Sequence, residues 1–127
     1  ENIAKAKMAI VCESEKSVLQ YISYFGTANN ICVAVCGSSL SKYQFDLLYR
    51  LGISELVLGF DRDFEEKWSD DYIRVQKKFK KVYDKYSPFV NVSFLFDTEC
   101  DTLGYKSSPL DEGKEKFLYL FRNRVIL

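Results

Sequence analysis

Acidic side chains follow two apolar segments of the chain. Glu13 comes directly after the run 8–12, and Asp61 and Asp63 come directly after the run 55–60. If these runs are neighbouring strands, three carboxylates meet in a small volume, where they repel one another unless a cation lies among them. The chain has no histidine, and oxygen ligands alone suit Mg²⁺ or Mn²⁺, which also accept phosphate oxygens. The spacing therefore favours phosphoryl or nucleotidyl transfer.

The elements that must position these carboxylates alternate along the chain. Apolar and β-branched runs predict strands over residues 8–12, 31–35, 55–60 and 90–96. Helical spacing of apolar residues and capping patterns predict helices over residues 15–25, 41–51, 69–86 and 108–122. The strand over 90–96 alternates in a way that predicts two unlike faces. Helix-length connections favour parallel pairing, so we expect a four-stranded, mainly parallel sheet with helices on both faces, a three-layer α/β sandwich.

Composition limits the class of protein. With 127 residues and 47% hydrophobic content, the chain is long enough for one core, and we expect a single domain over 1–127. Eighteen basic and eighteen acidic residues cancel, so binding to nucleic acid must be local or borrowed from other domains. No run of membrane-spanning length and no secretion signal is present, which predicts a cytoplasmic protein. Cys12, Cys32 and Cys36 lie in apolar runs and are interpreted as small hydrophobic residues, and zinc is not expected.

The carboxylate motifs, taken together, resemble the Toprim domain of bacterial and phage-type, DnaG-like DNA primases. The matching segments are IVCESEKS at 10–17, VCGSSLS at 35–41 and LGFDRD at 58–63. A further segment, YKSSPLDEGK at 105–114, is similar to a Lys-Asp-x-x-x-Asp region of phage-type primases. One departure is Ser107, which stands where the family commonly has aspartate. The missing ligand is then absent, or supplied by Asp97, Asp101 or Asp111.

The resemblance implies a Rossmann-like Toprim fold and a catalytic role in DNA replication. Glu13 would be a metal ligand or proton acceptor, and Asp61 and Asp63 would hold two Mg²⁺ or Mn²⁺ ions. The reaction would be nucleotidyl transfer from nucleoside triphosphates, making RNA primers on single-stranded DNA, with a replicative helicase as partner and no membrane. Primases of this family also have a zinc-binding domain and a basic subdomain. The chain is therefore interpreted as a fragment of a longer primase, weakly active or inactive alone.

Four further residues are candidates for binding nucleotide phosphate: Lys16, Gly37, Lys106 and Lys114. Lys16 lies near a predicted helix start, where free N–H groups favour anions, although it could equally be a solvated lysine or a partner of Glu13. Gly37 is expected in a turn with unusual backbone angles or where a phosphate approaches. Asp111 is a possible metal ligand, but at the third position of the last predicted helix it is more simply explained as a capping residue.

Other functions remain open. A Toprim nuclease would use the same carboxylates to hydrolyse phosphodiesters, and a non-catalytic module for binding nucleic acid or protein is consistent with Ser107. A phosphate-receiver domain fits poorly, because the acidic pair follows the third strand and not the first. The predicted helix over 69–86 carries an excess of three positive charges, which could contact a nucleic-acid backbone but is also typical of a solvated helix face.

Overall fold

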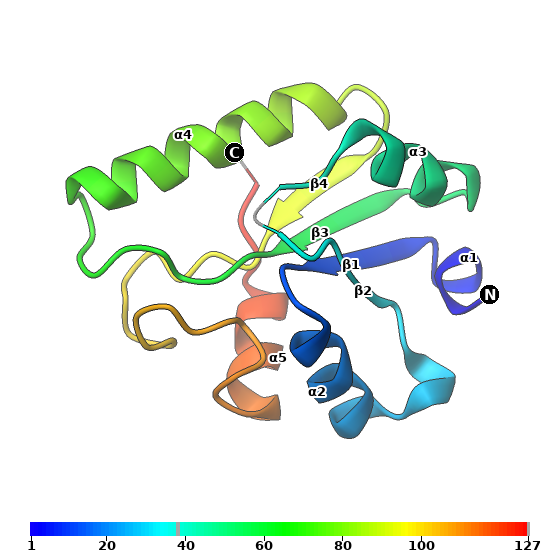
Figure 1. Ribbon diagram of the computed structural model, residues 1–127, viewed down its shortest axis with the longest axis horizontal. Coiled ribbons are helices and arrows are strands. Elements are labelled where there is room, and N and C mark those ends of the chain that lie inside the picture. The colour runs from blue at the N-terminus through cyan, green and yellow to red at the C-terminus, as the bar shows by residue number, and fades with distance from the viewer. Residues whose placement is uncertain (38, 127) are drawn as a thin grey trace.

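The computed structural model describes residues 1–37 and 39–126; Ser38, in the second predicted motif, and Leu127 lie outside the described residues. The strands are β1 (Met8–Cys12), β2 (Cys32–Ala34), β3 (Glu55–Gly59) and β4 (Asn91–Phe94). The helices are α1 (Asn2–Ala6), α2 (Glu15–Phe25), the short η1 (Thr27–Asn29), α3 (Lys42–Arg50), α4 (Asp70–Tyr86) and α5 (Lys114–Arg122). Figure 1 shows their arrangement around one sheet.

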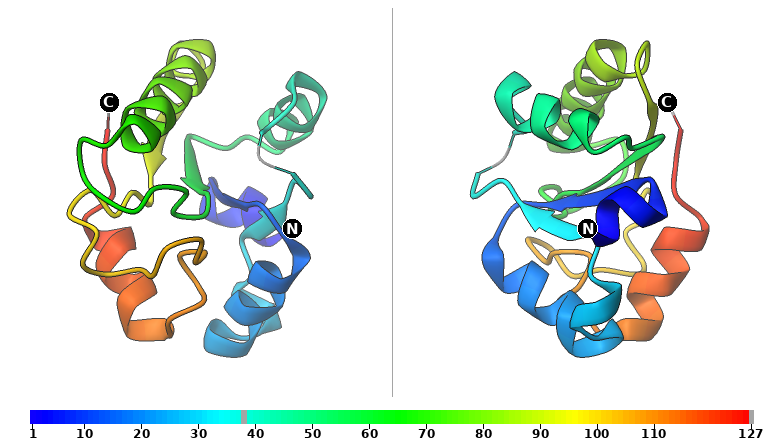
Figure 2. Two further views of the ribbon diagram at one scale, coloured as in Figure 1. Left: turned by 60° about the vertical axis from the view of Figure 1, so that its left-hand side comes forward. Right: turned by 90° about the vertical axis from the view of Figure 1, so that its right-hand side faces the viewer.

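The sheet has the order β2-β1-β3-β4, and all three pairings between its strands are parallel. Helices α3 and α4 lie over one face, and α2 and α5 lie over the other (Figure 2). This arrangement confirms the predicted three-layer α/β sandwich. In the register of β1 and β3, Cys12 lies opposite Gly59. The two chain segments that leave these strands, 13–14 and 60–63, therefore begin side by side.

Beyond Asn91 the last strand is buried on both faces, although the two faces differ in residue type as the alternation predicted. Ser93 and Leu95 are only 2% and 3% exposed. Leu95 packs in the cluster that includes Phe117 of α5, so this helix covers the side of the strand that carries Ser93 and Leu95. The Ser93 hydroxyl is satisfied by a 2.7 Å hydrogen bond to Glu55 Oε2. Parallel strands covered on both faces need no strict polar alternation.

The helix starts were predicted accurately where a capping side chain sets them. The Ser41 hydroxyl accepts from the Gln44 amide at 3.1 Å, and the Gln44 side chain accepts from the Ser41 amide at 2.9 Å, which is the predicted capping box. The Ser69 hydroxyl accepts from the Tyr72 amide at 3.2 Å at the start of α4. These bonds satisfy amides that have no partner within the helix.

The last helix begins later than the sequence predicted. It starts at Lys114, not Pro109, because Gly113 directly before it has a φ of +103°, outside the helical range. Asp111 consequently does not cap a helix. Its carboxylate accepts from the Ser108 amide at 2.8 Å, and its own amide donates to the Ser108 carbonyl at 3.1 Å, closing a turn. The short helix α1 was not predicted.

The cysteine predictions are partly right. Cys12 and Cys32 are buried free thiols with their sulfur atoms 3.3 Å apart, in agreement with a role as small hydrophobic residues. Cys36, in contrast, is exposed beyond the end of β2 with a positive φ of 56°. Among the described residues, no helix combines the length and apolar character required to cross a bilayer.

Candidate functional site

The predicted carboxylates meet at the carboxyl ends of β1 and β3. Glu13 Oε2 accepts a 2.6 Å hydrogen bond from the backbone amide of Asp61, so the side chain leaving one strand is anchored to the chain leaving the next. A cavity of about 240 Å³ opens beside them. Its lining consists of Glu13, Phe60, Asp61, Asp63, Arg74, Val75, Lys78 and Phe79. All three carboxylates therefore line one cavity, as expected for neighbouring parallel strands.

Negative charge in this cavity is incompletely compensated. The pKa of Asp61 is raised to about 6, mainly by burial and also by the nearby carboxylates of Glu13, Asp111 and Asp63, while Lys16 acts in the opposite direction. A carboxyl that gains protons so readily is one whose charged form is disfavoured by its surroundings. A cation would remove this cost, and perturbed carboxyls in a cavity are frequent at functional sites.

The residues of the cavity have the right chemistry to bind a divalent cation, but they are not arranged as a complete set of ligands. Carboxylate oxygens and the raised pKa of Asp61 suit Mg²⁺ or Mn²⁺. Within residues 1–37 and 39–126, however, no group of three acidic, cysteine or histidine side chains is arranged to hold a metal. The Asp63 carboxylate is ion-paired with the Lys106 ammonium group. Glu13 and Asp61 are thus close together, and the third predicted ligand is occupied by a lysine.

Lys106 lies next to Asp63 because Arg62 forms hydrogen bonds between the segment that follows β3 and the loop 103–107. The Arg62 amide donates to the Ser107 carbonyl at 2.9 Å, and the Lys106 amide donates to the Arg62 carbonyl at 2.7 Å. The buried guanidinium of Arg62 donates to the carbonyl oxygens of Leu103 and Glu65. The residue between the two aspartates is therefore structural, and it brings the 103–107 loop to the edge of the cavity. Sequence reasoning did not identify this role.

All three acidic residues considered as substitutes at Ser107 have partners of their own, and Asp111 is the one that also affects Asp61. Asp97 is buried and accepts from the amides of Thr102 and Leu103 at 3.1 and 2.8 Å, so it shapes the loop. Asp101 is exposed and accepts from the Thr102 hydroxyl at 3.2 Å. Asp111 alone of the three is among the charges that raise the pKa of Asp61.

Asp111 also holds Lys16 at the site. The Lys16 ammonium lies 3.0 Å from Asp111 Oδ1, and Gln20 donates to the same oxygen at 3.1 Å. Lys16 is 67% exposed along its side chain and is paired with Asp111, not with Glu13 as one alternative proposed. It remains near enough to Asp61 to oppose the rise of its pKa.

Two other candidates for phosphate binding have different surroundings. Lys114 lies over the Phe25 ring at 5.2 Å, and Phe25 ends α2, whereas Glu13 and Lys16 lie at its beginning. Lys114 therefore does not join the carboxylates. Gly37 does not have a positive φ, so the expectation of unusual backbone angles is wrong; that conformation belongs to Cys36. A side chain at Gly37 would meet open space, and its amide donates to the Glu13 carbonyl at 3.2 Å.

Sequence reasoning counted Arg74 and Lys78 among the basic residues of this helix but did not predict that they line the cavity, where they bring positive charge. The predicted order of strands and helices already implied that these two residues lie near the carboxylates. A helix that follows a parallel strand starts at the carboxyl edge of the sheet, so the first two turns of α4 must lie near Asp61 and Asp63. Their spacing of four residues places both side chains on one side of that helix.

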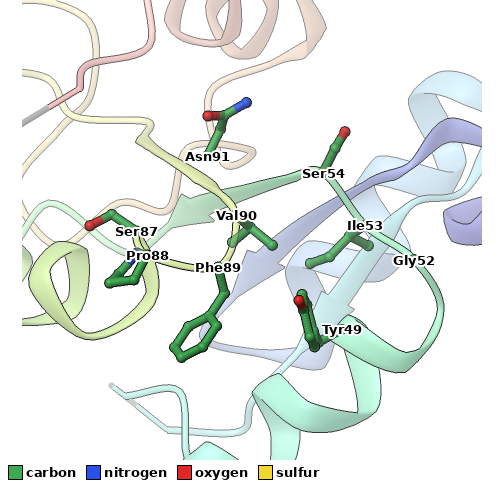
Figure 3. Close-up of a pocket in the computed structure, with 9 residues that line it drawn as sticks. All are labelled: Tyr49, Gly52, Ile53, Ser54, Ser87, Pro88, Phe89, Val90 and Asn91. Carbon is green, nitrogen blue, oxygen red and sulfur yellow. The ribbon is translucent and has the colours of Figure 1, made fainter.

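A larger cavity of about 570 Å³ lies at the opposite edge of the sheet, before β3 and β4. Figure 3 shows the rings of Tyr49 and Phe89 projecting on the same side of it. All nine lining residues are uncharged: Tyr49, Gly52, Ile53, Ser54, Ser87, Pro88, Phe89, Val90 and Asn91. The cavity offers none of the carboxylates or cations of the first site.

Comparison with known proteins gives one clear relative in sequence. No family model matches the chain. The SPbeta prophage-derived uncharacterized protein YorJ of Bacillus subtilis (strain 168) is 37% identical over 131 aligned positions, which cover 98% of this chain and 34% of that protein. The chain therefore spans about a third of the length of this relative. The similarity to a prophage protein agrees with the phage-type character predicted from the sequence.

Three solved structures of bacterial primases have a similar fold. The Aquifex aeolicus primase, comprising zinc-binding and RNA polymerase domains, matches 98% of this chain and 28% of its own, with a TM-score of 0.63 and 21% identity. The RNA polymerase domain of Mycobacterium tuberculosis primase DnaG matches with a TM-score of 0.65 and 20% identity, over 98% of this chain and 38% of its own. The same domain in complex with a double-stranded DNA oligomer carrying a 6-nucleotide overhang matches with a TM-score of 0.59 and 22% identity. This match covers 99% of this chain and 37% of that domain's chain. The chain thus has the fold of a segment of the RNA polymerase domain of DnaG-type primases.

Proposed function

We propose that this chain is the Toprim-type catalytic core of a DNA primase and carries out metal-dependent nucleotidyl transfer as part of a longer protein. The observation that carries the proposal is the contact between Glu13 and the Asp61 amide, in a cavity where the pKa of Asp61 is raised to about 6. The fold of primase domains around this cavity supports the choice of reaction. Single-stranded DNA, an RNA primer, nucleoside triphosphates and a replicative helicase are the proposed partners.

In this proposal Glu13 and Asp61 provide the first ligands of a divalent cation. When bound, such ions stabilise the attacking and leaving oxygens of a phosphoryl transfer. Asp63 joins the site when Lys106 moves from it to a phosphate of the substrate, an exchange of one anion for another at an exposed ammonium group. Lys16, held by Asp111 at the start of α2, is placed to meet a second phosphate.

Calorimetric titration with Mn²⁺, with and without ATP, tests the proposal. We expect Mn²⁺ to bind the wild-type chain, to bind more tightly with ATP present, and to lose its binding in Asp61→Asn/Asp63→Asn. The matched control is Asp70→Asn/Asp84→Asn, which removes the same charge from exposed positions of α4 outside the cavity. Absence of Mn²⁺ binding to the folded wild-type chain would refute the proposal and favour a non-catalytic module.

Incubation with labelled template and primer distinguishes synthesis from hydrolysis. Because the chain spans about a third of its prophage relative, we expect weak or no extension by the chain alone and metal-dependent extension by the longer protein. Extension should be lost in Glu13→Gln of that longer protein while the fold is retained. Shortening of the labelled strand without added triphosphates would instead identify a nuclease that uses the same carboxylates.

A further inference from the structure

Helix α4 carries a row of basic side chains: Arg74, Lys77, Lys78, Lys81 and Lys85. Because successive helical residues are about 100° apart, these five fall within about 100° of the helix circumference. The apolar residues Tyr72, Val75, Phe79 and Tyr86 are the buried ones and form a separate stripe that faces the sheet. Figure 1 shows α4 as an outer element of the molecule, and the side chains of the row are exposed except for Lys78, which is partly buried.

The row begins at the carboxylate cavity. Arg74 and Lys78 line that cavity with the three carboxylates. The Lys78 ammonium lies 5.0 Å from the centre of the ring of Phe60, which is another lining residue. Lys81 and Lys85 continue the row toward the other end of the helix. A ligand that follows the row would therefore enter the cavity.

The positive charge of the row is largely uncompensated within the part of the chain that the structure describes. Arg74 forms an ion pair with Asp71 at 2.7 Å, and none of the four lysines of the row forms one. The remaining acidic residues of α4 are Asp70, in its first turn, and Asp84, which pairs with Lys80 outside the row. In a chain with a net charge of zero, this row is a local concentration of positive charge.

The length of the row favours a polymer over a single nucleotide. From Arg74 to Lys85 the helix rises by about 16 Å, farther than the three linked phosphates of one triphosphate extend. Aromatic rings are absent from the row itself, so it offers charges for phosphates and no platform for bases. Such a surface binds a backbone without reading its sequence.

We propose that a single strand of nucleic acid lies with its phosphate backbone along the basic row of α4 and with one end in the carboxylate cavity. The inference rests on the proposed function, because it names the path by which a strand reaches that site. It also gives Arg74 and Lys78 a role in binding the phosphate nearest to the carboxylates.

The test uses Lys77→Gln/Lys81→Gln/Lys85→Gln, three changes on the row that leave the cavity lining intact. Binding of a fluorescein-labelled single-stranded oligonucleotide is measured by anisotropy over a range of salt concentrations. Since each phosphate contact on a single strand contributes about 0.7 to the salt slope, we expect the slope to fall by about 2. The control, Lys5→Gln/Lys42→Gln/Lys116→Gln, removes equal charge from exposed sites elsewhere and should keep the wild-type slope.

Mn²⁺ and ATP binding by the same triple variant separates this inference from the proposed function. We expect both to be unchanged, because the three lysines lie outside the cavity. Equal slopes for the row variant and the control variant would overturn the inference, as would a wild-type chain that does not bind the strand. A parallel loss of ATP binding would also overturn it, by assigning the row to the triphosphate. Absence of Mn²⁺ binding to the wild-type chain is a different result, and it would refute the proposed function.

Discussion

Replacing Asp61 by asparagine should stabilise the protein at neutral pH. The pKa of Asp61 is raised from 3.8 to about 6 by burial and by its acidic neighbours. In the unfolded chain the Asp61 carboxyl loses its proton near the ordinary pKa of aspartate, whereas in the folded chain it keeps the proton until about pH 6. The free energy of unfolding therefore falls as the pH rises from about 4 to about 6 and stays at its lower value above that, and asparagine, which stays neutral, avoids that loss.

The size of the effect follows from the shift. A difference of about two pKa units corresponds to about 3 kcal/mol, and partial exposure of the carboxyl reduces this to about 1 to 2 kcal/mol through solvent screening. In the described part of the chain, the Asp61 side chain makes no hydrogen bond; only its backbone amide does. The substitution consequently removes charge without removing a bonded partner.

Urea unfolding at pH 4, 5 and 7 measures this gain, with Asp70→Asn as the control at an exposed position. The stability difference between Asp61→Asn and wild type should be small at pH 4, grow through pH 5 and reach its full value at pH 7. With Mn²⁺ added, the wild type should become more stable than Asp61→Asn, because the wild type gains binding free energy that the variant lacks. A variant no more stable than wild type at pH 7 would refute the argument that this carboxylate is held at an energetic cost.

Three other changes test separate parts of the structure. Mn²⁺ binding should weaken about tenfold from pH 7 to pH 5, as Asp61 gains a proton through its pKa of about 6, and calorimetry at both values checks this. Lys106→Gln should tighten Mn²⁺ binding alone, since it frees Asp63, but weaken the gain from ATP; both are read by the same titration. Arg62→Gln should cost about 2 to 4 kcal/mol in urea unfolding, because it leaves the carbonyls of Leu103 and Glu65 without their donor.

The sequence predicted most of the sheet and the meeting of Glu13 with Asp61. Both depend on local patterns that survive in the fold: apolar strands, capping residues such as Ser41, and the rule that parallel strands end at one edge. The start of α5 was missed because a proline pattern was weighed above Gly113, whose positive φ prevents a helix from passing through it.

Other features of the site depend on tertiary packing. The rotation of α4 about its axis decides that Arg74 and Lys78 reach the cavity, and this rotation is set by how Val75 and Phe79 pack below it. The pairing of Asp63 with Lys106 depends on a buried arginine that joins segments 41 residues apart. No local pattern encodes contacts of this kind, since each joins residues distant in sequence.

The hydrogen bond from the Asp61 amide to Glu13 has a consequence for how such a protein changes during evolution. The donor belongs to the main chain, and every residue except proline possesses it. A gene can therefore exchange the side chain at position 61 in one step, remove a carboxylate from the cavity, and still present Glu13 in its original orientation on an intact sheet. Relatives that keep this carboxylate and relatives that have lost it would be hard to tell apart by fold alone, and position 61 is where they would differ.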